Sequence, residues 1–352
     1  MRRAAPGASA KLSGLASVDL RVHPLYWAIL LLVVLAAATK SAQVPFHFWL
    51  PGAMAAPTPA SAYLHSATMV KAGIVLLLLL APGFADTSLW LWVVTATGLV
   101  TMALGALTAI RQRDLKLLLA YGTVSQLGFM TALIGLGFTA AALAVLVAHS
   151  LFKAALFLIV GIVDKATGTR RIGELSGVGA QMPVVAVAGA VAAGSMAGLP
   201  PFLGFVTKEA AFDTLIKAED WLPLAVVAVS SALTVAYAAR WWFGAFGTRD
   251  GAEATPAARP LANMVLAPLV LGLLTVGFGV NPASLATEVK DAVGQGVKLV
   301  LWPGLTPALG VSSIVVIAGV WLYLTWVRSA ELDPKRRRRS LPRAADIYAA
   351  SI

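Results

Sequence analysis

Lysines and histidines recur inside the most apolar parts of this sequence. His149 and Lys153 lie four residues apart in a stretch that is otherwise mostly Ala, Val, Leu and Phe, so on a helix their side chains share one face. Two positive charges on one face repel each other, and burial disfavours the charged form of each group, so at least one of the pair must be neutral at rest. Side chains that gain and lose a proton in this way can form a proton relay.

A second group of basic side chains surrounds a proline-interrupted segment. Lys40 ends an apolar run that begins at Leu25, Pro45 follows it, and His65 and Lys71 lie in the next apolar region. Proline removes a backbone donor and breaks a helix, and transporters place ion sites at such breaks within the membrane. Imidazole, with an ordinary pKa of about 6.5, exchanges protons near neutrality. The pattern is therefore typical of a proton path.

Each of these three basic residues also has a structural interpretation. Lys40 at a helix end can extend its amine to the membrane surface, Lys71 can anchor a helix at the interface, and His65 can bond a core carbonyl. An ionisable group at membrane depth costs from about 3 to more than 10 kcal/mol. A chain that carries several of them there favours a functional interpretation.

A further break carries two more ionisable residues. Pro200 and Pro201 interrupt a long apolar segment, and Lys208 and Glu209 follow the interruption. The alternative is that Lys208 and Glu209 form an ordinary loop ion pair. Transporters place ion sites at breaks of this kind, so Lys208 and Glu209 are further candidates for an ion site.

The composition is that of a polytopic membrane protein. Of 352 residues, 59% are hydrophobic and 12% are charged, against about 25% charged in soluble proteins, and the mean hydropathy is +0.83. The absence of cysteine excludes disulfides and cysteine metal sites. The net charge of +11 falls mostly in loops and tails, where orientation rules and anionic lipids explain it without nucleic acid.

Nine apolar segments are long enough, whole or in two halves, to cross a bilayer. We predict an all-α transmembrane bundle with spans at about 24–50, 58–80, 88–110, 117–136, 140–163, 181–215, 222–246, 261–280 and 306–327. In this count the basic loops 111–116 and 164–174 and the tail after Arg328 share one side. Their excess of Lys and Arg indicates that this side is cytoplasmic. Asp114 and Asp164 in those loops are interpreted as salt-bridged surface groups.

Two near-continuous motifs carry a family resemblance. They are Lys40-Ser-Ala-Gln-Val-Pro-Phe-His-Phe-Trp-Leu-Pro51 and Ala56-Pro-Thr-Pro-Ala-Ser-Ala-Tyr-Leu-His-Ser-Ala-Thr-Met-Val-Lys-Ala-Gly73. They resemble the antiporter-like subunits shared by respiratory complex I and Mrp-type Na+/H+ antiporters. The variant with His47 and Lys71 is most similar to the large A-type subunit of the Mrp antiporter. Asp164-Lys-Ala-Thr-Gly-Thr-Arg-Arg-Ile172 points the same way.

The resemblance implies an antiporter-like fold with two discontinuous helices and an inverted repeat. Residues 24–80 are then the last two helices of a partial first repeat, 81–246 the complete second repeat, and 247–328 the C-terminal spans with an amphipathic connector. Residues 1–23 and 329–352 are basic tails, the second cytoplasmic. In related subunits several spans precede the Lys40 motif, with an intramembrane glutamate that pairs with that lysine. The chain is therefore expected to lack those amino-terminal spans.

The resemblance also assigns roles to individual residues. The residue matching Lys40 is the central protonatable group of one half-channel, His149-x-x-x-Lys153-Ala-x-Leu-Phe-Leu matches a central histidine–lysine pair, and the Lys208 region delivers the proton at the far exit. The expected helix breaks are at Pro45, Pro200 and Pro201. The expected proton pathway comprises Lys40, His65, Lys71, His149, Lys153, Lys208 and Glu209.

The implied function is a proton-conducting membrane subunit of a multi-subunit monovalent cation (Na+)/H+ antiporter. It would work in the cell membrane as a multi-pass protein, with other membrane subunits as partners and H+ and Na+ as the transported ions. No cofactor and no catalytic centre are expected. The alternatives are a proton-pumping subunit of an NADH:quinone oxidoreductase or a membrane-bound hydrogenase, and a truncated remnant that does not transport.

Overall fold

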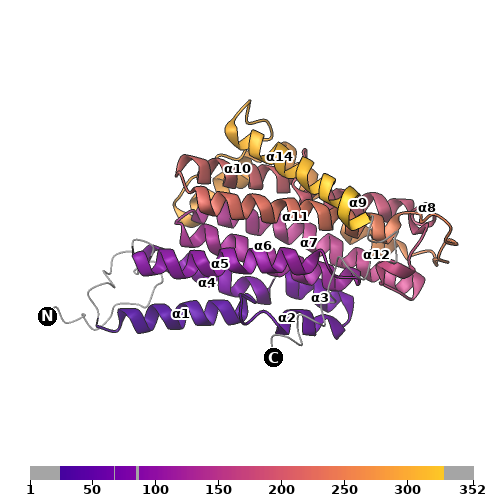
Figure 1. Ribbon diagram of the computed structural model, residues 1–352, viewed down its shortest axis with the longest axis horizontal. Helices are drawn as coiled ribbons and strands as arrows, with labels where there is room; N and C mark the ends of the chain where they lie inside the picture. Colours follow the sequence, from indigo (N-terminus) through magenta and orange to yellow (C-terminus); the bar gives the residue numbers. More distant parts are fainter. Residues whose placement is uncertain (1–23, 67, 85–86, 329–352) are drawn as a thin grey trace.

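The computed structural model describes residues 24–66, 68–84 and 87–328, so the two predicted tails lie outside the described residues. The chain folds into the all-α bundle that the sequence predicts (Figure 1). The helices in order are α1 (Tyr26–Lys40), α2 (Trp49–Gly52), α3 (Thr58–Ser66), α4 (Met69–Phe84), α5 (Ser88–Ala109), α6 (Leu115–Gly135), α7 (Thr139–Thr167), α8 (Val178–Gln181), α9 (Pro183–Ala197), α10 (Leu203–Lys217), α11 (Trp221–Phe246), α12 (Ala262–Val280), α13 (Ala283–Val293) and α14 (Pro307–Leu322).

Both predicted breaks are present. The helix α1 ends at Lys40, before Pro45, and the broken span beyond Gln181 divides into α9 and α10, with Pro200 and Pro201 between them. Seven stretches in the described part are long and apolar enough to cross a membrane, and α1 and α9 are shorter apolar helices. The second predicted span, 58–80, differs from the prediction. It forms two helices, α3 and α4, instead of one, and α4 continues to Phe84.

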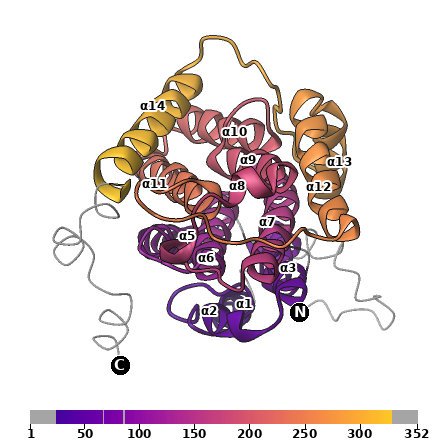
Figure 2. The same ribbon diagram turned by 90° about the vertical axis from the view of Figure 1, so that its right-hand side faces the viewer.

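The central helix of the bundle is α6, which contacts α4, α5, α7 and α11. Of its most apolar 18-residue window, 94% is buried within the chain itself. Seen along the helices, α14 lies on one flank of the bundle and α12 with α13 on the other, with α6 and α7 between them (Figure 2). Polar side chains along this buried window of α6 therefore face protein.

The basic loops meet at one end of the bundle, as predicted. The Leu115 amide donates to the Arg170 carbonyl at 3.0 Å, and the Ile172 amide donates to the Arg113 carbonyl at 2.9 Å. The loop 247–260 joins them there, since the guanidinium of Arg249 donates to the Gly173 carbonyl at 2.7 Å. We call this the basic end of the bundle.

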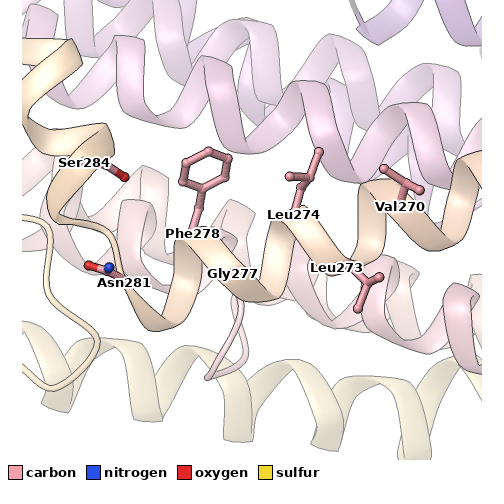
Figure 3. A pocket seen from close by; sticks show the side chains of 7 residues that line it. All are labelled: Val270, Leu273, Leu274, Gly277, Phe278, Asn281 and Ser284. Atoms are coloured by element: carbon pink, nitrogen blue, oxygen red, sulfur yellow. The ribbon is translucent and has the colours of Figure 1, made fainter.

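The predicted amphipathic connector forms α13 at the opposite end. Leu285 and Val289 are its buried face, and the Gln295 side chain beyond it accepts a bond from the Ala140 amide at the start of α7, at 3.2 Å. A pocket of about 370 Å³ lies beside this connector, on α12 and the start of α13 (Figure 3). It is lined by Val270, Leu273, Leu274, Gly277, Phe278, Asn281 and Ser284. None of these side chains is ionisable, so the lining of this pocket offers no group that gains or loses a proton.

Candidate functional site

The His149–Lys153 pair lies at the centre of the bundle. Both side chains are fully buried on one face of α7, as their spacing predicts. The Lys153 amine donates to the Leu119 carbonyl of α6 at 2.9 Å. The His149 ring packs edge-on against Phe152, 5.3 Å between centroids, and its two nitrogens have no hydrogen-bond partner within the described part of the chain. The pair is thus buried with unused proton-binding capacity.

Lys71 connects α4 to the same face of α7. Its side chain is buried, and its amine donates to the Ser66 carbonyl and to the Ser150 hydroxyl. Ser150 directly follows His149 in the sequence. The interpretation of Lys71 as a membrane-interface anchor is therefore wrong, because its amine points into the bundle.

His65 completes this group from α3. Its ring stacks on Phe157 of α7, 4.4 Å between centroids at 25°, and the charges of Lys153, Lys116 and Lys71 all act on it. Neither ring nitrogen has a hydrogen-bond partner among residues 24–66, 68–84 and 87–328. The interpretation of His65 as a core histidine bonded to a carbonyl therefore does not agree with the contacts of the described residues.

A buried lysine that the sequence reasoning placed in a loop adds a further amine. Lys116 is 1% exposed, and its amine donates to the Met54 carbonyl at 2.9 Å and to the Ala56 carbonyl. Asp114 caps α6 by accepting from the amide of Lys116. This Asp-x-Lys spacing is the signal that could have placed Lys116 in the first turn of a helix and not in solvent.

A buried tyrosine beside Lys153 is the other residue that the sequence did not indicate. Tyr237 of α11 is fully buried. Gly122 of α6 separates the two side chains, since a Cβ there would lie 3.0 Å from the Lys153 amine and 3.3 Å from the Tyr237 ring. No spacing pattern in the sequence links α11 to α7, so only the packing of three helices brings these groups together.

The second break holds Lys208 at the end of α9. The Lys208 amine donates to the carbonyls of Met196 and Ala197 at 2.9 and 3.1 Å. These belong to the last turn of a helix, where free carbonyls and the helix dipole favour a cation. Gly198 adopts φ +84° and leaves room for the lysine stem, because a Cβ there would lie 2.9 Å from Lys208 Cδ.

Glu209 faces a different neighbour from Lys208. Its carboxylate accepts a hydrogen bond from the Ser312 hydroxyl of α14, and it is 3% exposed. No ion pair joins Lys208 to Glu209 in the described residues. The interpretation of these two residues as an ordinary loop ion pair is therefore wrong.

Lys40 is not brought into the buried group. It lies exposed at the end of α1, and its amine has no hydrogen bond or ion pair with the residues that the structure describes. The break that follows is held by the Ser41 hydroxyl, which donates to the Val70 carbonyl at 2.7 Å. The role expected of Lys40 stays a prediction.

Asp114 and Asp164 are salt-bridged, as predicted. Arg170 contacts Asp114 at 2.6 Å and Asp164 at 3.7 Å. The hydrogen bond that Arg170 donates to Asp114 raises the pKa of the Arg170 guanidinium above its ordinary value, although burial opposes the rise. These carboxylates are occupied by arginine and are not free to relay protons.

The chain is similar in sequence and in structure to known antiporter subunits. The chain is 43% identical over 332 residues to a probable A/B subunit of a K(+)/H(+) antiporter of Rhizobium meliloti, covering 88% of this chain and 33% of that one. It is 38% identical over 360 residues to the A-type subunit of the Na(+)/H(+) antiporter of Alkalihalophilus pseudofirmus, covering 88% and 45%. The Mrp complex structure from Dietzia sp. DQ12-45-1b matches with a TM-score of 0.81 and 37% identity, over 97% of this chain and 38% of that chain.

The chain spans between a third and a half of the length of these relatives. The fold is the antiporter-like fold of the Mrp complex, and the protein is a multi-pass membrane protein. The family model for the transmembrane part of NADH:quinone oxidoreductase and Mrp antiporter proteins matches residues 9–234, which is more than half of the sequence. The chain therefore belongs to the NADH:quinone oxidoreductase/Mrp antiporter transmembrane family.

Proposed function

We propose that this chain is a proton-conducting membrane subunit of a multi-subunit monovalent cation/H+ antiporter in the cell membrane. One observation carries the proposal: Lys71 of α4 bonds Ser150 of α7, next to the buried His149, and Lys153 lies one turn further along the same face. Amines and imidazoles from separate helices thus gather in the centre of the bundle. Their burial there costs stability, and a transport function explains why the chain carries them.

The proposed relay uses the complementary chemistry of the two side-chain types. A buried amine held by a carbonyl can bind a proton and can release it to a neutral imidazole nearby. The ring nitrogens of His65 and His149, which have no hydrogen-bond partner among the described residues, suit these side chains to accept that proton, directly or through water. A membrane potential supplies about 2.3 kcal/mol per charge per 100 mV, which is enough to bias such transfers.

The rest of the proposed pathway extends to the second break. Lys208 and Glu209 would exchange protons with the far surface, and Lys116 would extend the relay toward the basic end. Lys40 remains a proposed member on the family resemblance alone, because its amine is exposed at the end of α1.

The antiporter proposal also implies which ions are transported and which partners the chain has. Two relatives are named for K+ and for Na+, so the transported cation is proposed as monovalent, with Na+ first. We propose other membrane subunits as partners and no catalytic step in this chain. The family description also covers NADH:quinone oxidoreductase, which is the second candidate assembly.

The test is cation-dependent proton movement in inside-out vesicles that carry the assembled complex. Lys153→Ala is expected to abolish the movement. Lys165→Ala is the matched control, because Lys165 lies on the same helix but is exposed, and it should leave the movement intact. Equal activity of the two variants would remove Lys153 from the pathway.

A further inference from the structure

Three ionisable side chains form a ladder along α10. Glu209, Asp213 and Lys217 follow one another at intervals of four residues, which places them on one helical face. Glu209 is 3% exposed, whereas the side chains of Asp213 and Lys217 are 30% and 68% exposed. The ladder therefore leads from the buried interior to solvent. We call these three residues the α10 ladder.

The ladder opens at the end of the bundle opposite the basic end. The helix α10 starts at the second break and stops at Lys217, and α11 then returns from Trp221 to Phe246, beside the loop that packs on the basic end. Lys217 donates to Asp213 at 2.6 Å. An exposed pair of this kind contributes about 0–1 kcal/mol to stability, so the Lys217–Asp213 pair does little to stabilise the fold.

The buried member of the ladder is held by a helix outside the predicted second repeat. Ser312 of α14 donates to Oε2 of Glu209. Oε1 of Glu209 has no partner within the described residues. Both oxygens of a carboxylate can accept hydrogen bonds. Ser312 therefore holds Oε2 in place, and Oε1 stays able to bind a proton.

Lys208 and Glu209 face opposite sides of this arrangement. The Lys208 amine lies on the carbonyls of Met196 and Ala197, inside the break, and the Glu209 carboxylate lies on α14. The two neighbours therefore connect the end of α9 with the contact between α10 and α14.

We propose that the α10 ladder conducts protons between the second break and the outer surface, with Ser312 as a positioning residue for Glu209. A proton bound at Oε1 of Glu209 passes to the Asp213 carboxylate, and Glu209 returns to the carboxylate that accepts from Ser312. Asp213 then releases the proton to solvent and regains its pair with Lys217. This inference rests on the proposed antiporter function and deepens it.

The test combines transport with infrared spectroscopy on the assembled complex. Infrared difference spectra between acidic and alkaline pH report protonated carboxyl groups, and Glu209→Gln identifies the band of Glu209. Ser312→Ala should shift that band, because the carboxyl group loses its donor, and should slow cation-dependent proton movement about tenfold, the factor that one hydrogen bond to a charged group is worth.

The control for Ser312 is its neighbour in the sequence of α14. Ser313 is exposed and bonds only the Leu309 carbonyl of its own helix at 2.8 Å, so Ser313→Ala should change neither the band nor the rate. If Ser312→Ala does not assemble, Ser312→Thr and Ser312→Val replace it, since they have the same shape and only Thr keeps the donor. The band should then shift in the Val variant alone.

A third comparison tests the outer part of the ladder. Asp213→Asn should slow proton movement about as much as Ser312→Ala. Asp220→Asn, which alters a carboxylate at the same end but outside the ladder, should not. A Ser312→Ala variant with an unshifted Glu209 band, or an Asp213→Asn variant as active as Asp220→Asn, would overturn the proposal. A wild-type complex without cation-dependent proton movement would instead contradict the proposed function, and the band shift would still report on Ser312 and Glu209.

Discussion

The Lys71 amine on α4 donates a hydrogen bond to the Ser150 hydroxyl on α7. This bond joins the last helix before the predicted second repeat to the residue that follows His149. The same amine also donates to the Ser66 carbonyl at the end of α3. A single buried side chain thus ties together three helices, two of which carry the histidines of the proposed relay.

Removal of the Ser150 hydroxyl should separate Lys71 from the relay. We expect Ser150→Ala to slow cation-dependent proton movement about tenfold, since it removes a hydrogen bond to a charged group. Thr108→Ala is the control, because Thr108 is half-buried on α5 and its hydroxyl donates to the Leu104 carbonyl of the same helix. Proton movement in inside-out vesicles measures both. Equal rates would show that the bond to Ser150 has no part in transport.

Lys116 should matter for stability as well as for transport. Lys116→Met keeps the apolar stem but leaves the buried Met54 carbonyl without its donor, at a cost of about 1–3 kcal/mol. Thermal unfolding of the purified complex in detergent should therefore show a lower midpoint than for Lys165→Met, whose amine is exposed. An unchanged midpoint would contradict the contacts described for Lys116.

A comparison of Gly198 with Gly137 distinguishes the effect of backbone strain from an effect on transport at the second break. Gly198 and Gly137 both adopt φ +84°, so alanine at either costs about 1–2 kcal/mol. Only at Gly198 would the added Cβ meet the Lys208 stem. We expect both variants to lose similar stability and Gly198→Ala alone to lose proton movement. Equal transport in the two variants would show that the position of the Lys208 amine is not critical.

The arginine bridge at the basic end should be dispensable for transport. Arg170→Ala removes the guanidinium that bridges Asp114 and Asp164, and all three side chains are partly exposed. Pairs at such positions contribute about 0–1 kcal/mol, so the unfolding midpoint should fall slightly and proton movement should stay at the wild-type rate. A large loss of transport would assign these carboxylates to the proton path, against their interpretation as structural groups.

The sequence predicts the features that depend on local chemistry. Apolar segments, proline breaks and basic loops each follow from a short stretch of residues, and the breaks after Lys40 and between α9 and α10 are where the prolines predict them. The shared burial of His149 and Lys153 follows from helical spacing alone. The family motifs supplied the fold, because two long and nearly continuous stretches around the first break match.

The sequence does not predict the contacts that depend on how helices pack. Ser150, Ser312 and Tyr237 contribute to the site through partners more than 70 residues away or across a third helix. The burial of Lys116 requires the segment at Met54 to fold back over α6. The exposure of Lys40 likewise depends on which helices surround α1, and no pattern in the sequence around it gives that information.

The most direct test of the proposed relay is proton flux through His149→Phe. The charges of Lys71 and Lys153 both act on His149, and phenylalanine keeps an aromatic ring against Phe152 while it removes the titratable nitrogens. Flux would be measured with a pH-sensitive dye in proteoliposomes that contain the assembled complex under an imposed membrane potential. The relay predicts a loss of proton flux of at least about a hundredfold, the lower range for removal of a proton-transfer group. A wild-type flux in His149→Phe would contradict it.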